Sequence, residues 1–180
     1  MQLGGAATHA VLRYQRAAIE AGQWWRLFSG NLVHLGWYHL GLNVLALLLL
    51  IALCAEPLRW RDWWARVGIL GAGVGVGLYL FAPGINNYVG LSGLVHGLFV
   101  LGLWPLVRKG DVVAVGCFAF LIAKLAYECV SGAPLSDARA IGGSVVTESH
   151  LFGALTAIGY GCVRSRRGRR AVVHETTEDR

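Results

Sequence analysis

Five long apolar segments constrain the fold of this chain more than any other feature. They cover residues 35–54, 63–82, 91–107, 112–130 and 145–163. Each has about 17 to 20 residues, and a helix of that length crosses ~30 Å of hydrocarbon. In lipid, a single segment can pair its own backbone N–H and C=O groups only as a helix, so the pattern predicts five membrane-spanning helices. The expected fold class is all-α, a polytopic membrane helix bundle.

Composition agrees with this expectation and excludes other classes. Of 180 residues, 56% are hydrophobic and 14% charged, which is more apolar surface than a soluble domain of this size can bury. The net charge of +6 does not indicate nucleic-acid binding, because five arginines crowd into positions 164–170 instead of covering a face. The four cysteines are isolated and lack CxxC spacing. We therefore expect no disulfide framework, no metal site and no cofactor.

Basic residues predict the orientation of the bundle. They cluster at 59–66 and 108–109 and again after the fifth segment, and the positive-inside rule makes their common side cytoplasmic. The chain then divides into an outer N-terminal segment with the first loop (1–34), a membrane domain (35–163) and a tail (164–180). The tail is first basic and then acidic, lacks apolar periodicity, and is expected to be disordered.

The N-terminus does not fit an odd number of spans. Five spans place it outside, yet residues 1–34 contain no basic region followed by an apolar one, so no signal peptide is evident. We therefore expect that a helix upstream of this sequence is missing. The alternative is that the short N-terminus is translocated together with the first span.

Polar side chains in three of the segments gather at one depth. An ionisable side chain in a span costs free energy and is a functional candidate by default. His39 and Asn43 share a face near the outer end of the first span, and Ser92 and His96 share one in the third. His150 lies near the outer end of the fifth. Purely structural readings are helix–helix hydrogen bonds for the histidines and Asn43, and a bond back to its own helix for Ser92.

Small residues favour a close approach of the third and fifth spans. Gly93 and Gly97 lie beside the serine, and His150 heads a stripe of small residues that begins with Gly153. Such packing would bring Ser92 and His150 together, where an imidazole can take a proton from a hydroxyl. A serine nucleophile, an imidazole base and further donors are the groups that acyl transfer requires.

Lys124 and Glu128 form a further i,i+4 pair, in the fourth span. Burying opposite charges together is the usual way to tolerate either, so we favour a structural or positioning pair over a catalytic role. Glu148 lies two residues before His150 and therefore on another face of its helix. Because no other carboxylate is well placed, the sequence predicts a Ser–His dyad rather than a triad.

The ordered segments WWRLFSGNLVH, HLGLN, GLSG and HLFG resemble the rhomboid family of intramembrane serine proteases. The resemblance covers roughly residues 23–163, and the set on successive spans is specific although each motif alone is weak. The segments GNLVHLGWYHLGLN and GLSGLVHG are similar to those of the rhombosortase branch. The family implies a six-helix core with the serine helix at its centre, so the five spans evident here lack its first helix.

The resemblance assigns roles to individual residues. Ser92 matches the nucleophile of the GxSG motif, whose glycines are Gly90 and Gly93. His150 matches the general base of the HxxG motif, which ends at Gly153.

Other positions match supporting parts of the family's site. His39 and Asn43 match the side chains that stabilise the oxyanion, and Trp25 and Arg26 match the WR pair of the first outer loop, which is structural. The loop at 131–144 takes the place of the lid over the active site.

His96 departs from the pattern of many rhomboids, which carry an aromatic residue there. A histidine fits the rhombosortase branch, and it raises the question of which imidazole is the base. We favour His150, because the family's base comes from the last span. His96, Lys124 and Glu128 are expected to be accessory.

The resemblance implies an intramembrane serine endopeptidase. Rhombosortases act on exported proteins that end in a Gly-Gly motif, a hydrophobic span and a basic cluster. The expected partners are therefore such anchored transmembrane substrates and the lipid bilayer. The expected location is the bacterial inner membrane, with the active site facing the periplasm and the C-terminus in the cytoplasm.

Two other functions compete with this one. The first is a catalytically silent rhomboid-like protein that binds membrane clients, and the intact Ser/His/His/Asn set argues against it. The second is a metal protein that uses its histidines and Glu128 as ligands. No HExxH or paired-histidine spacing supports a metal site, and it leaves Asn43 and Ser92 unexplained.

Overall fold

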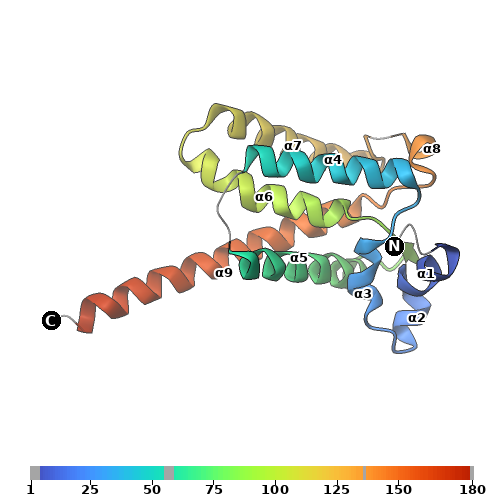
Figure 1. Ribbon diagram of the computed structural model, residues 1–180, viewed down its shortest axis with the longest axis horizontal. Helices are drawn as coiled ribbons and strands as arrows, with labels where there is room; N and C mark the ends of the chain where they lie inside the picture. Colours follow the sequence, from blue (N-terminus) through green and yellow to red (C-terminus); the bar gives the residue numbers. More distant parts are fainter. Residues whose placement is uncertain (1–4, 55–58, 136, 179–180) are drawn as a thin grey trace.

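The computed structural model describes residues 5–54, 59–135 and 137–178. Five long helices form its body, and each corresponds to one of the five predicted segments (Figure 1). The prediction of an all-α bundle is therefore confirmed. The five are α4 (Trp37–Leu53), α5 (Trp60–Phe81), α6 (Ser92–Arg108), α7 (Val112–Ser131) and α9 (Glu148–Glu178).

Short elements surround the end of the bundle at which α6 and α9 begin, which is called the outer end after the predicted orientation. The segment before α4 holds α1 (Gly5–Leu12), α2 (Arg16–Glu20), α3 (Arg26–Ser29) and the 3-10 turn η2 (Gly30–Leu32), and α8 (Ala138–Ile141) precedes α9. Strand β1 (Tyr14–Gln15) pairs antiparallel with β2 (Asn87–Tyr88). This small sheet ties the outer segment to the link that leads into α6.

Length and composition support membrane crossing to different degrees among the described helices. Helices α5 and α7 are long and apolar enough to cross, and α3–η2 with α4 forms a third candidate, bent by 90° at its break. Helix α6 is apolar but has 17 residues, which is the lower limit for the hydrocarbon core. That all five helices cross the bilayer stays a prediction.

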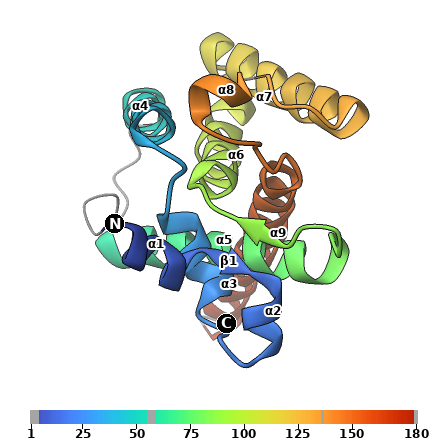
Figure 2. The same cartoon turned by 90° about the vertical axis from the view of Figure 1, so that its right-hand side faces the viewer.

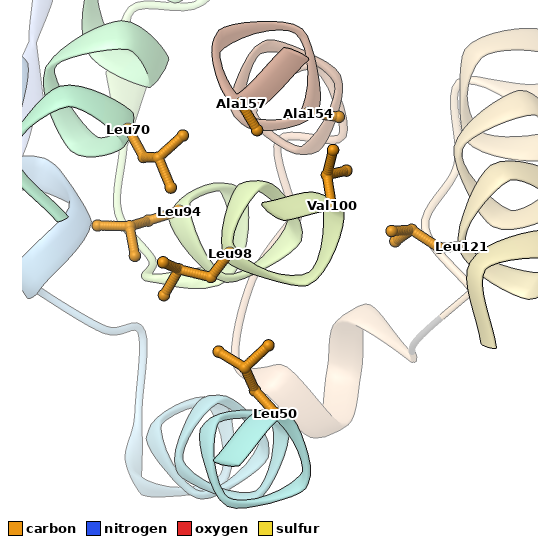
Figure 3. Close-up of a cluster of buried hydrophobic side chains, with 8 residues drawn as sticks. All are labelled: Leu50, Leu70, Leu94, Leu98, Val100, Leu121, Ala154 and Ala157. Atoms are coloured by element: carbon orange, nitrogen blue, oxygen red, sulfur yellow. The ribbon is translucent and has the colours of Figure 1, made fainter. Parts of the chain in front are cut away.

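Helix α6 is the centre of the bundle. It contacts α4, α5, α7 and α9, and the view along the bundle in Figure 2 shows it between them. Because lipid is as apolar as these side chains, close packing holds such helices together. The buried cluster around α6 consists of Leu50, Leu70, Leu94, Leu98, Val100, Leu121, Ala154 and Ala157 (Figure 3).

Glycines let α6 and α9 approach at backbone distance. A Cβ added to Gly93 would lie 2.6 Å from the carbonyl oxygen of Ser149, and one on Gly97 would lie 2.7 Å from that of Gly153. A Cβ on Gly153 would collide with the carbonyl of Gly93. The predicted close packing of the third and fifth segments is thereby confirmed, and it sets the first turns of both helices at one level.

The WR pair ties α3 to the first helix. Arg26 is 6% exposed, and its Nη1 donates hydrogen bonds of 2.9 and 2.8 Å to the carbonyls of Ala10 and Arg13. The indole of the more exposed Trp25 donates to the carbonyl of Val11 at 3.4 Å. Both residues therefore bridge separate turns of the outer segment.

Arg16 joins the same outer segment to the end of α5. Its guanidinium donates to the carbonyls of Leu78, Tyr79 and Ala82 at 2.9, 3.1 and 3.0 Å. Carbonyls in the last turn of a helix have no N–H partner within it. One side chain thus bonds two carbonyls in the last turn of α5 and the carbonyl of the residue that follows the helix.

The end of the chain departs from the prediction. Instead of a disordered tail from residue 164, α9 continues as a helix to Glu178, and residues 179–180 lie outside the described ones. Once a helix has nucleated, each further residue adds one hydrogen bond as it is ordered. The tail contains no proline that would stop this extension.

Candidate active site

Ser92 opens α6 and meets a histidine from the last helix. Its Oγ lies 2.9 Å from Nε2 of His150, in the first turn of α9. His150 is 4% exposed, whereas Ser92 is partly buried. The glycine contacts between α6 and α9 thus bring the predicted pair within hydrogen-bonding distance.

His39 faces the serine across Gly90. The Nδ1 of His39 accepts a hydrogen bond from the backbone N–H of Leu35 at 3.4 Å, which places the ring proton on Nε2. A Cβ added to Gly90 would lie 3.1 Å from that Nε2 and 3.7 Å from Ser92 Oγ. Gly90 has a φ of 136°, which favours glycine. A Cβ would also lie only 2.9 Å from Cε1 of His39, so the glycine lets this turn lie directly against the His39 ring, beside the serine hydroxyl.

Asn43 is buried one turn below His39. Its Nδ2 donates to the backbone carbonyl of His39 at 3.0 Å. This bond uses one of the two amide hydrogens. The structure therefore places Asn43 on the predicted face, bonded back to its own helix.

Glu128 corrects the predicted dyad. Its Oε2 lies 2.8 Å from Nδ1 of His150, and its side chain is 2% exposed. The prediction that no carboxylate is well placed is wrong, because pairing with Lys124 occupies only one of the two carboxylate oxygens. The available signal was depth, since Glu128 lies near the outer end of α7, at the level of Ser92 and His150.

Lys124 and His96 complete the cluster. The Nζ of Lys124 lies 2.7 Å from Glu128 Oε1, 2.9 Å from His96 Nε2 and 3.4 Å from His150 Nδ1. Nδ1 of His96 lies 2.7 Å from the carbonyl oxygen of Ser92. The rings of His96 and His150 stack with centroids 4.1 Å apart and planes inclined by 12°. All three expected accessory residues therefore reach the site.

Three of the candidate metal ligands also come together. Ligand atoms of His96, Glu128 and His150 lie within 4.8 Å of one another. The Lys124 ammonium lies among them, within 3.4 Å of all three residues. An internal cation thus already occupies the place that a metal ion would take.

Tyr88 shapes the turn before Ser92, and the sequence did not predict this role. Its buried hydroxyl hydrogen-bonds the carbonyl of Gly90 and lies 3.2 Å from Oδ1 of Asn31. Burial raises the pKa of Tyr88, so the phenol keeps the proton that it donates. The available signal was the tyrosine two residues before the first glycine of GLSG.

Comparison with known proteins matches most of the chain to one family. Residues 21–167 match the Rhomboid domain family. The chain is 27% identical over 138 residues to YdcA of Bacillus subtilis (strain 168), named as a candidate rhomboid protease, and the match covers 75% of this chain and 64% of YdcA. It is 31% identical over 147 residues to the uncharacterized proteins Rv1337 of Mycobacterium tuberculosis and Mb1372 of Mycobacterium bovis, covering 74% of this chain and 56% of each.

The chain thus spans less than two thirds of the length of these curated relatives. The family match nevertheless includes the whole of α4, α5, α6 and α7, and α9 as far as residue 167. On this match, the protein belongs to the rhomboid family.

Proposed function

We propose that this chain is an intramembrane serine endopeptidase. Ser92 is the nucleophile, His150 the general base, and His39 and Asn43 stabilise the oxyanion. The observation that carries the proposal is the 2.9 Å contact between Ser92 Oγ and His150 Nε2. Membership of the rhomboid family, which suggests intramembrane proteolysis, supports the same assignment.

In the first half of the reaction, Ser92 Oγ attacks a peptide carbonyl and His150 Nε2 takes the hydroxyl proton. The carbonyl oxygen then carries negative charge and needs donors already in place. The Nε2–H of His39, which lies against Gly90 on the side of Ser92, is one such donor. The backbone N–H of Ser92, in the first turn of α6, has no partner within its helix and is a further donor.

The His150 imidazolium then gives its proton to the leaving amine, the peptide C–N bond breaks, and Ser92 is left as an acyl-enzyme. In the second half, water attacks the acyl-enzyme while His150 again acts as the base, and Ser92 recovers its proton. These steps need no cofactor.

The proposed substrate is an exported protein with a C-terminal anchor that carries Gly-Gly, an apolar span and a basic cluster. This choice rests on the similarity of GLSGLVHG, including His96, to the rhombosortase branch. Each glycine weakens a helix by about 1 kcal/mol relative to alanine, which eases the unwinding that a cut requires.

The distribution of basic residues supports a location in the bacterial inner membrane. Figure 1 shows the starts of α5 and α7 and the end of α6 at one end of the bundle, opposite the starts of α6 and α9. Arg59, Arg108 and Lys109 therefore lie at the end remote from Ser92. The positive-inside rule then orients the site toward the periplasm and the C-terminus toward the cytoplasm.

The test is co-expression with a membrane reporter that ends in such a Gly-Gly anchor. We expect wild type and the exposed-serine control Ser165→Ala to release the reporter, and Ser92→Ala to leave it anchored. Release of the reporter by Ser92→Ala would show that Ser92 is not the nucleophile. A folded wild type that neither releases the reporter nor reacts with a fluorophosphonate probe would instead be a client-binding protein without catalysis.

A further inference from the structure

We propose that Glu128 is a positioning residue that selects the reactive tautomer of His150, and that Lys124 and His96 hold Glu128 in place. The contacts form a closed ring. It leaves Ser92 at its carbonyl, passes through His96, Lys124, Glu128 and His150, and returns to the serine hydroxyl. The inference rests on the proposed function, because it concerns how the same serine is activated.

The tautomer of His150 follows from its two contacts. An ionised carboxylate only accepts hydrogen bonds, so Glu128 Oε2 at 2.8 Å places the ring proton on Nδ1. Nε2 is then bare and lies 2.9 Å from Ser92 Oγ, ready to accept the hydroxyl proton. The opposite tautomer would point an N–H at the serine and block proton transfer.

The same reasoning excludes His96 as the base. A backbone carbonyl only accepts, so the 2.7 Å contact with Ser92 O places the proton of His96 on Nδ1. Its Nε2 accepts from the Lys124 ammonium at 2.9 Å. Neither nitrogen is available to the serine hydroxyl. His96 instead orients Lys124 and stacks on the ring of His150.

Glu128 and Lys124 act on the His150 charge in opposite directions. When His150 takes the serine proton, the carboxylate at 2.8 Å stabilises the imidazolium and the ammonium at 3.4 Å destabilises it. Lys124 is nevertheless needed, because it keeps the buried carboxylate ionised and paired. A purely structural ion pair within α7 would not act with opposite signs on the reaction.

The groups that face His150 come from each helix packed around it. They are Ser92 and His96 on α6, Lys124 and Glu128 on α7, His39 on α4 and the exposed Glu148 on α9 itself. Of the two carboxylates, Glu128 makes the 2.8 Å contact with the ring, whereas Glu148 is exposed and acts on it only through its charge. Glu148→Gln is therefore the matched control for Glu128→Gln.

The experiment measures the rate of fluorophosphonate labelling of Ser92 across pH on the purified full chain, beside cleavage of the reporter. For Glu128→Gln we expect labelling and kcat to fall about 100-fold or more, with KM little changed. The acidic limb of its pH profile should move to lower pH, because the imidazolium has lost its counter-charge. For Lys124→Met that limb should move to higher pH, and Glu148→Gln should stay within about threefold of wild type.

The double variant Glu128→Gln/Lys124→Met sharpens the test. In Glu128→Gln, the ammonium attracts the amide oxygen, so the amide N–H faces His150 Nδ1 and favours the unreactive tautomer. Without Lys124 the amide can turn its oxygen to Nδ1. We therefore expect the double variant to react faster than Glu128→Gln alone, an order that loss of packing does not produce.

The outcomes separate the two proposals. Unchanged labelling and pH profile in Glu128→Gln, with an active wild type, would overturn the positioning role and leave the peptidase standing. If wild type is inactive, NMR of 15N-labelled histidine still decides the tautomer. A proton on Nδ1 of His150 that moves to Nε2 in Glu128→Gln supports the inference, and a proton on Nε2 in wild type overturns it.

Discussion

Gly153 of α9 packs directly against the carbonyl of Gly93 of α6, the residue after Ser92. The backbones are so close that neither glycine has room for a Cβ. The contact lies one turn from the Ser92–His150 hydrogen bond and therefore controls the separation of these two side chains.

Gly153→Ala is expected to reduce both stability and activity. The added methyl group overpacks the contact with Gly93, at a cost of about 1–3 kcal/mol. It also moves His150 away from Ser92, and a misplacement of about 1 Å costs on the order of 100-fold in rate. Thermal unfolding in detergent and fluorophosphonate labelling measure the two effects.

Gly159→Ala is the control on the same helix. A Cβ at Gly159 meets nothing within 4 Å, so we expect full activity and unchanged or slightly higher stability. Equal behaviour of the two variants would contradict the role assigned to the close contact.

His150→Ala is expected to abolish labelling of Ser92, whereas His96→Ala should slow it without abolishing it. Of these two histidines, His150 places its Nε2 2.9 Å from Ser92 Oγ, whereas both ring nitrogens of His96 have other partners. Rate constants for the fluorophosphonate reaction distinguish the two histidines. A His96→Ala variant that is as inert as His150→Ala would reopen the choice of base.

Gly90→Ala is expected to inactivate the enzyme. A Cβ at this position would fill the space beside His39 Nε2, and the φ of 136° is strained for alanine. Loss of an oxyanion donor costs about 10²–10³-fold in kcat, which His39→Ala should show by itself. Gly84→Ala, in the same link with nothing within 4 Å of its Cβ, should behave as wild type. Normal turnover by Gly90→Ala would place the oxyanion elsewhere.

Arg26→Lys is expected to lower stability by about 1–3 kcal/mol while the positive charge is kept. A lysine ammonium cannot reproduce the planar contacts of the guanidinium with the carbonyls of Ala10 and Arg13. The unfolding temperature in detergent checks this, with the exposed Arg139→Lys as the control. A variant as stable as that control would show that these bonds contribute little.

Local patterns determined much of the site. The five apolar segments, the shared depth of Ser92, His39 and His150, and the small-residue faces of α6 and α9 all follow from residue type and helical spacing. Hydropathy and helical periodicity act within one segment, so they can be read without knowing its neighbours. The WWR, HLGLN, GLSG and HLFG segments added the family by resemblance.

Other features depended on contacts between segments. The sequence indicated that Lys124 and Glu128 pair, because that contact lies within one helix. It did not indicate that the second oxygen of Glu128 reaches His150, 22 residues away on another helix. Tyr88 and Arg16 were missed for the same reason, since their partners lie on other elements.

The sequence alone therefore determined which polar groups stand at the outer level of the bundle, because that level depends only on position along each helix. Only the tertiary structure decided which of them touch. The rotation of α7 against α9 selects Glu128 for His150 Nδ1, and the backbone contact of α6 with α9 selects Ser92 for Nε2. These choices come from side-chain packing between helices, which no pattern within a single helix specifies.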